Sequence, residues 1–365
     1  MLNLPSLTGL RGVAALWVMA YHVSQLAPAM GANWIGHVPL LSAGWVGVDL
    51  FFVLSGFILM WVHGEEFAAP TAATVRHFAA MRLVRVYPLS LAVLGLIALM
   101  VWADPSFAVW FKAKNPDNLS LSAFVRTAAL ATRWVGASGG DWNQPVWSLS
   151  AEVLGYAAFP LLAWGLARRA FGTAMIIAVT SLAAFAGFQS LAGIVGVNTI
   201  DQVSALTRMA CCFTAGIAIC RMRHAAPGWG ARFAGLGAVA LCLTLVAALQ
   251  MKAGFIVAPM VFAALIFALS FQSGIIDRAL SSAPAVLLGR ISFPLYLVHL
   301  MPLQWMVSHI HGAGQAAATG YVAAYAALCL AAAYLLHRVV ERPAHHWARG
   351  GFAMPSLFRG RLSPT

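Results

Sequence analysis

The sequence predicts an all-α membrane protein, a polytopic bundle of about ten transmembrane helices with both termini in the cytoplasm. Hydrophobic residues make up 61% of its 365 residues and charged residues only 9%, whereas soluble globular domains carry about 25% charged residues. The apolar residues also form long unbroken runs. In lipid only helices or closed barrels satisfy the backbone, and runs of this length are helical. We therefore expect one membrane-embedded domain over residues 1–349.

Each predicted span is an apolar stretch near the roughly 20 residues that cross a bilayer, bounded by charges or by Pro/Gly turns. The predicted spans are 7–27, 44–63, 87–103, 146–167, 173–192, 205–220, 231–249, 254–273, 285–308 and 319–338. The longest connection, 104–145, is rich in Trp, Asn, Asp and Gly, and 121–135 could form a short interfacial or re-entrant helix. Residues 350–365 are basic and rich in Gly and Pro, which predicts a disordered cytoplasmic tail.

The net charge of +12 is explained by the excess of arginine that cytoplasmic loops carry. With the N-terminus inside, few basic residues fall in the outside connections. They are Lys112, Lys114, Arg126, Arg133 and Lys252. This asymmetry favours both termini inside, and no motif for nucleic acid is present. No cluster has the spacing of metal ligands, so no metal is expected.

Charged or titratable residues inside predicted spans are the first candidates for function, because each charge costs roughly 2.5–3.5 kcal/mol on insertion. Arg11 and His22 lie in the first span, eleven residues apart, so they share one helical face and stand roughly 16 Å apart along the axis. The alternating span directions place His22, Asp49 and Glu152 in the outer half of the membrane. One histidine and two carboxylates can therefore converge at one level.

A second group of charges lies at the inner level. Arg82 and Arg85 are three residues apart, hence on one helical face, and Arg11 is at the inner end of the first span. Guanidinium groups suit phosphate oxygens. We expect a phosphate-bearing donor at the cytoplasmic mouth, and a long thin molecule such as acyl-coenzyme A fits the distance to His22 better than a compact nucleotide.

Six short motifs occur in order over nearly the whole chain. They are Arg11 with His22 (Arg-x10-His); Gly44, Gly47, Val48, Asp49, Phe51, Phe52, Ser55, Gly56 and Phe57; Arg82 and Arg85 followed by Tyr87-Pro88; Trp147, Ser148, Leu149 and Glu152; Ser292, Tyr296, Leu297 and His299; and Glu341 with Pro343. Phe293 replaces a tyrosine that is common in the fifth motif. In this combination the sequence resembles the acyltransferase 3 family of integral-membrane O-acyltransferases.

The resemblance implies about ten spans in a bacterial inner membrane. It also implies an acyl-coenzyme A donor, usually acetyl, and acceptors that are hydroxyls of glycans, exopolysaccharides or lipid-linked sugars. The family further implies that His22 is catalytic and that Arg82 and Arg85, here grouped with Arg11, serve the donor.

We interpret His22 as a general base, because an imidazole with a pKa near 6.5 can take a hydroxyl proton at neutral pH. Asp49 or Glu152 would orient it. An acyl-histidine intermediate stays open. For both carboxylates the alternative is a structural role near a helix start, where a negative charge complements the dipole. Ser148 or the Trp147 indole could donate to the oxyanion, and His299 could line the acceptor path or make a core hydrogen bond.

The rival functional class is a proton-coupled transporter or flippase of a sugar-containing substrate, in which the intramembrane His, Asp and Glu would relay protons. The sequence shows no inverted repeat and no paired broken helices in corresponding halves, which disfavours that class.

Overall fold

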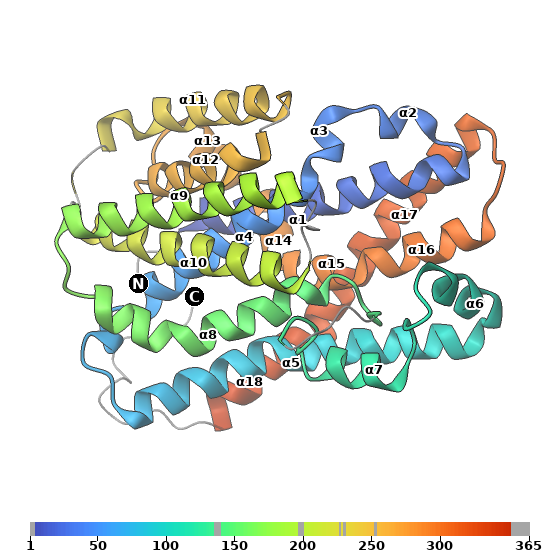
Figure 1. Ribbon diagram of the computed structural model, residues 1–365, viewed down its shortest axis with the longest axis horizontal. Coiled ribbons are helices and arrows are strands. Elements are labelled where there is room, and N and C mark those ends of the chain that lie inside the picture. Colours follow the sequence, from blue (N-terminus) through green and yellow to red (C-terminus); the bar gives the residue numbers. More distant parts are fainter. Residues whose placement is uncertain are drawn as a thin grey trace.

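The computed structural model describes residues 4–134, 140–195, 201–225, 228, 231–251 and 254–351. All regular secondary structure in these ranges is helical, which confirms the predicted all-α class. Figure 1 shows the long helices running broadly along one axis, with the short helices α2 and α6 gathered towards one end. The predicted tail begins inside the last helix, α18 (Arg342–Gly351), and residues 352–365 lie outside the described residues.

Within the described ranges, seven helices are long and apolar enough to cross a membrane, and nine segments qualify if each bent pair counts as one span. The seven are built on α1 (Pro5–Leu26), α4 (Gly47–His63), α5 (Ala72–Ala103), α8 (Val146–Leu166), α9 (Phe171–Val195), α10 (Gln202–Ala225) and α17 (Gln315–Leu336). A further apolar helix, α11 (Ala231–Leu249), is shorter. The chain is therefore a multi-pass membrane protein.

Two predicted spans involve broken helices. The helix α12 (Gly254–Leu269) meets α13 (Gly274–Leu280) at 89°, and the turn between them uses the positive φ of Gly274, +94°. The predicted span 285–308 bends by 52° between α14 (Ala283–Arg290) and the pair α15 (Ser292–Val298) and α16 (Leu300–His309). A break inside a membrane helix leaves backbone N–H and C=O groups without helical partners, and such groups are tolerated where they are buried in protein or line a cavity.

The connections also contain helices. The first long connection holds α2 (Asn33–Gly36) and α3 (Pro39–Ser42), and the connection 104–145 holds α6 (Pro105–Lys114) and α7 (Leu121–Ala128). The short helix foreseen within 121–135 is thus confirmed as α7. The remaining elements are η1 (Ala27–Met30), η2 (Gly44–Val46), η3 (Glu66–Ala68) and the π-helical turn η4 (His337–Glu341).

Helix α5 begins fifteen residues earlier than the predicted span at 87, counting from Ala72. The Thr71 hydroxyl caps it by accepting a hydrogen bond from the backbone N–H of Thr74. The helix continues through Pro88, which removes a single backbone donor. Arg82 and Arg85 therefore belong to the same continuous helix as the predicted span, before its expected start at residue 87.

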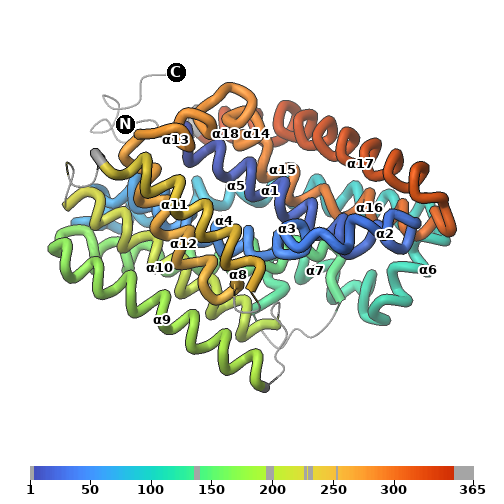
Figure 2. Tube along the Cα trace, turned by 90° about the horizontal axis from the view of Figure 1, so that it is seen from above, coloured from blue at the N-terminus to red at the C-terminus, as the bar shows by residue number. Residues whose placement is uncertain are grey.

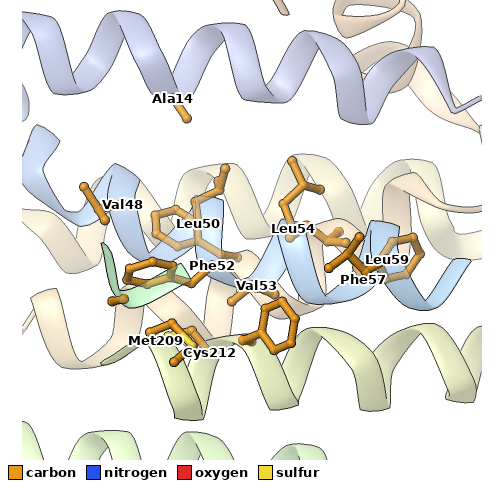
Figure 3. Close-up of a cluster of buried hydrophobic side chains, with 14 of the residues drawn as sticks. Ala14, Val48, Leu50, Phe52, Val53, Leu54, Phe57, Leu59, Met209 and Cys212 are labelled. Carbon is orange, nitrogen blue, oxygen red and sulfur yellow. The ribbon is translucent and has the colours of Figure 1, made fainter. Parts of the chain in front are cut away.

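The core is centred on α4, which lies between α1 and α10 in Figure 3. Phe52, Val53 and Phe57 fill this layer and are almost fully buried. Gly56 and Gly216 allow the backbones of α4 and α10 to approach closely, because a Cβ on either would lie 2.0 Å from a carbonyl oxygen of the other helix. Figure 2 shows α9 and α17 at opposite edges of the molecule, with α1 and α4 between them.

Candidate active site

Two histidines from distant parts of the chain meet beside α1. His22 lies near the end of α1, and His299 occupies the break between α15 and α16. The Nε2 atom of His299 is 3.1 Å from Nδ1 of His22, and the ring centroids are 4.9 Å apart. His299 is fully buried, whereas His22 reaches a cavity. His299 lies in the second limb of the predicted ninth span, after the 52° bend between Arg290 and Ser292.

His22 lines a large cavity of about 770 Å³. We call it the outer cavity, and the arginine-lined cavity described below the inner cavity, after the sides of the membrane that the predicted topology gives them. Its wall combines aromatic and polar side chains, with residues from α1, from the connection 104–145 and from α16. They include Tyr21, Gln25, Trp45, Trp110, Arg133, Asp141, Trp147, Arg208 and Gln304. Flat aromatic faces beside hydrogen-bonding groups make a site for a polar molecule with apolar faces.

One wall of the outer cavity is fixed by the ion pair of Arg133 with Asp141, whose Nη2 and Oδ2 atoms are 3.0 Å apart. Both residues lie in the connection between spans. Burial raises the pKa of the Asp141 carboxyl, and the Arg133 guanidinium opposes that rise. The pair shapes the wall without adding net charge to it.

A second ion pair lies behind the cavity, deep between α4 and α10. Nε of Arg208 donates to Oδ1 of Asp49 over 2.8 Å, with the side chains only 1% and 0% exposed. The Arg208 guanidinium also lies 5.2 Å from the ring centres of both Trp45 and Trp147. Asp49 is therefore engaged by an arginine and makes no hydrogen bond to His22.

The three arginines expected to bind the donor line one smaller inner cavity of about 150 Å³. Arg11 comes from α1, and Arg82 and Arg85 come from α5. Glu152 lies in the same cavity and accepts a 2.5 Å hydrogen bond from the Ser55 hydroxyl. The three arginines thus lie together as the sequence suggested. Glu152 lies with these arginines and not beside His22.

The charges of this inner cavity are only partly balanced. Arg85 pairs with Glu341 of η4, a side chain 4% exposed that also accepts from His337 Nδ1 over 2.7 Å. Among the residues that the structure describes, neither Arg11 nor Arg82 has a carboxylate within 4.0 Å, and Nε of Arg82 is buried without a hydrogen-bond partner. The cavity therefore offers guanidinium donors of half-buried arginines to an anion.

The two cavities share two wall residues, Val48 and Tyr296. The Tyr296 hydroxyl is 2.6 Å from Oγ of Ser148, and its ring packs edge-on against Phe51. We call Val48 and Tyr296 the partition. It forms the wall common to the cavity lined by the arginines and the cavity lined by His22.

The structure brings some predicted site residues together and separates others. Arg11, Arg82 and Arg85 converge, and His22 lies in the other cavity. The expected layer of His22, Asp49 and Glu152 does not form a contact, because Asp49 pairs with Arg208 and Glu152 with Ser55. Within the described ranges, no three His, Cys, Asp or Glu side chains gather as metal ligands would.

Three residues that shape the site carried weaker signals. Arg208 is a charged residue inside an apolar run. A charge within the membrane is costly unless it is paired, and Asp49 is its partner. Glu341 and Tyr296 belong to motifs noted in the sequence, but motif membership does not indicate their partners. Those partners, Arg85 and Ser148, are more than 140 residues away in the chain.

These features define a class: a multi-pass helical membrane protein with a two-chambered polar site, in which three half-buried arginines line one cavity and the His22 imidazole lines the other. The family follows from comparison with known proteins. The model of the acyltransferase 3 family, described as an acyltransferase domain, matches residues 4–338. The chain belongs to this family and is an enzyme of the O-acetyltransferase type.

Individual relatives agree with the assignment. The chain is 29% identical over 379 residues to acyltransferase MdmB of Streptomyces mycarofaciens, covering 93% of this chain and 91% of that protein. It is 29% identical over 167 residues to O-acetyltransferase OatA of Staphylococcus aureus, covering 44% of this chain and 24% of that protein. Protein 2 in the picA locus of Rhizobium radiobacter is 28% identical over 184 residues, 48% of this chain and 90% of that protein. No solved structure matches the chain significantly.

Proposed function

We propose that the protein transfers an acyl group, acetyl by default, from acyl-coenzyme A in the inner cavity to a hydroxyl of a glycan or glycolipid in the outer cavity. The acceptor would belong to the cell envelope or to an exopolysaccharide, and the enzyme to a bacterial inner membrane with both termini inside. The observation that carries this proposal is the pair of adjoining cavities, with arginines in one and His22 in the other.

The donor assignment rests on charge and size. The buried Nε of Arg82 needs an acceptor, and phosphate oxygens of coenzyme A would supply it. A cavity of about 150 Å³ is too small for a whole coenzyme A. In the proposal the acyl end enters towards the partition, while the nucleotide end remains at the mouth beside Arg11 and Arg85.

The acceptor assignment rests on the outer cavity. Tyr21, Trp45 and Trp110 present aromatic faces, while Gln25 and Gln304 present amides that can bond hydroxyl groups. Sugar rings combine apolar faces with hydroxyl edges, so this lining suits them. One relative carries the name O-acetyltransferase, which supports a hydroxyl acceptor and an acetyl donor.

The proposed reaction needs one base and no metal. Nε2 of His22 takes the hydroxyl proton as the acceptor oxygen attacks the thioester carbonyl carbon, forming the new C–O bond. The C–S bond then breaks, and the coenzyme A thiolate leaves with the proton returned from His22. The ester and the free thiol are the products, so atoms and charge balance. The tetrahedral oxyanion would form near the partition, where Ser148 and Trp147 are the proposed donors.

The two carboxylates take different places in this proposal. Glu152 would act in the inner cavity with the donor arginines, because it lines the cavity they share. Asp49 would act through Arg208, which it holds against the wall of the outer cavity. Neither would orient His22.

The test replaces His22 by Ala in a host strain that lacks the gene and is complemented by each variant. Surface glycans are analysed for O-acetyl groups by NMR, and the variant is quantified in isolated membranes. We expect O-acetylation to fall at least a hundredfold at normal protein level, the usual scale for loss of a general base. His309→Ala is the matched control, since His309 lies at the outer end of α16 and is 33% exposed. Retained acetylation in the His22 variant would refute the assignment.

A further inference from the structure

The hydrogen bonds around His299 determine which of its nitrogens carries the proton. Nδ1 of His299 is 2.8 Å from the carbonyl oxygen of Tyr296 and 3.2 Å from that of Leu295. Carbonyl oxygens only accept hydrogen bonds, so Nδ1 must carry the hydrogen. A neutral imidazole has one N–H, which leaves a lone pair on Nε2 of His299.

That lone pair in turn fixes the tautomer of His22. Nε2 of His299 lies 3.1 Å from Nδ1 of His22, and the carbonyl oxygen of Val18 lies 3.0 Å from the same atom. Both neighbours are acceptors, so Nδ1 of His22 is the donor. The lone pair of neutral His22 is then on Nε2, the nitrogen that the two acceptors leave for the outer cavity.

The neutral state of His299 follows from its surroundings. Its side chain is fully buried, and among the residues that the structure describes no carboxylate lies within ion-pair distance of it. A buried charge without a partner is costly, so the uncharged form is favoured. The backbone at this position is also held, because the Tyr325 hydroxyl of α17 donates to the backbone carbonyl of His299 over 3.0 Å.

We propose that His299 is a positioning residue that holds His22 as the Nδ1–H tautomer and so presents Nε2 of His22 to the acceptor hydroxyl. This inference rests on the proposed role of His22 as base. In hydrolase triads a carboxylate performs the same task. Here a neutral imidazole replaces it, and it also accepts the Nδ1–H of the imidazolium that forms when His22 takes the proton.

The decisive measurement is ¹⁵N solid-state NMR of the full chain, labelled at histidine, in phosphatidylethanolamine–phosphatidylglycerol vesicles at neutral pH. The chain has 11 histidines, and the His22 signals are identified by their loss in His22→Gln. We expect Nδ1 of His22 to be protonated and Nε2 to be bare. A protonated Nε2 on neutral His22 overturns the proposal, independently of any activity measurement.

Variants of His299 provide the second arm. His299→Leu removes the acceptor and should let His22 populate both tautomers, with kcat lowered about tenfold and the KM of either substrate changed less than about threefold. His299→Gln can place an amide oxygen near the former Nε2 position and should recover most of the wild-type kcat. His309→Leu, at the exposed end of α16, is the matched control and should match wild type.

The outcomes separate this inference from the proposed function. An unchanged kcat and an unchanged His22 tautomer in His299→Leu would overturn the positioning role while leaving His22 as base. Full activity in His22→Ala would overturn the proposed function itself. Equal loss in His299→Leu and His299→Gln, with the His22 tautomer unaltered in both, would reduce His299 to a packing residue and overturn the proposal.

Discussion

Replacing Asp49 by Asn would decide whether this carboxylate is part of the chemistry or part of the scaffold. Asparagine keeps the shape and the Oδ1 acceptor for Nε of Arg208 but removes the negative charge. Breaking a buried ion pair by removing one partner costs about 3–5 kcal/mol. The Trp45 and Trp147 rings remain 5.2 Å from the guanidinium and still attract the cation. We therefore expect the lower end, a loss of about 3 kcal/mol in the free energy of unfolding.

The assay is reversible unfolding in mixed micelles with an increasing fraction of sodium dodecyl sulfate, followed by circular dichroism. The double variant Asp49→Asn with Arg208→Met should regain about 2 kcal/mol, because uncharged residues replace a buried pair at little cost. Asp277→Asn is the matched control. Asp277 is 8% exposed, with no basic group within 4.0 Å in the described ranges.

Two results would contradict this reasoning. The first is an Asp49→Asn protein with the unfolding free energy of the wild type but no transferase activity, since the carboxylate would then serve the reaction directly. The second is an equal loss of stability in the Asp277 control, which would show that any buried carboxylate here contributes as much as the paired one.

Two further predictions concern the inner cavity and the junction of α5 with α6. Arg82→Gln should raise the KM for acetyl-coenzyme A about tenfold or more by removing a charged phosphate contact, whereas Arg76→Gln, exposed on the same helix, should not; equal KM values would remove Arg82 from donor binding. Hydrogen bonds led by that of Ser106, with contributions from the Phe107 N–H and Trp305, lower the pKa of Asp104 to about 2. The ionised Asp104 carboxylate should therefore stabilise the folded protein fully above the unfolded-state pKa near 3.8, and this contribution should disappear as the pH falls through 2. The melting-temperature difference between wild type and Asp104→Asn, measured from pH 2 to pH 7, checks this, and a difference that grows with acidity would contradict it.

The arginines of the inner cavity were predictable from the sequence because helical geometry is local. Arg82 and Arg85 are one turn apart on α5, and the level of Arg11 follows from its place at the start of α1. These positions depend on rise per residue and span direction, both of which the apolar pattern indicates. Their common cavity required only that α1 and α5 be neighbours.

The partners of the acidic residues were not predictable in the same way. The direction that Asp49 faces is set by how α4 turns against α10, where Gly56 lies against the Phe213 backbone and Gly216 against the Val53 backbone. Residues at this interface are about 160 positions apart in the chain. The depth of a residue in the membrane can be inferred from one sequence. The direction in which its side chain points around the helix axis depends on how the neighbouring helices pack.

The neighbour of His22 was hidden by a bend. A straight ninth span would give no reason for His299 to stand opposite α1 rather than any other helix. The span bends by 52° between Arg290 and Ser292, and beyond the bend the His299 carbonyl accepts a hydrogen bond from the Tyr325 hydroxyl of α17. Proline content signals such breaks, but the direction of a bend follows from tertiary contacts.

The partition has a consequence for the electrical insulation of the membrane. Moving one elementary charge through a potential of 100 mV is worth about 2.3 kcal/mol, so any continuous water path between the two chambers would leak protons. Tyr296 and Val48 are 8% and 4% exposed, and they stand where such a path would run. In the proposed reaction the uncharged acyl group would cross at this point, while the phosphates of its carrier would stay on the inner side. Under that proposal the enzyme would pass an acyl group from one chamber to the other without opening a path for protons across the bilayer.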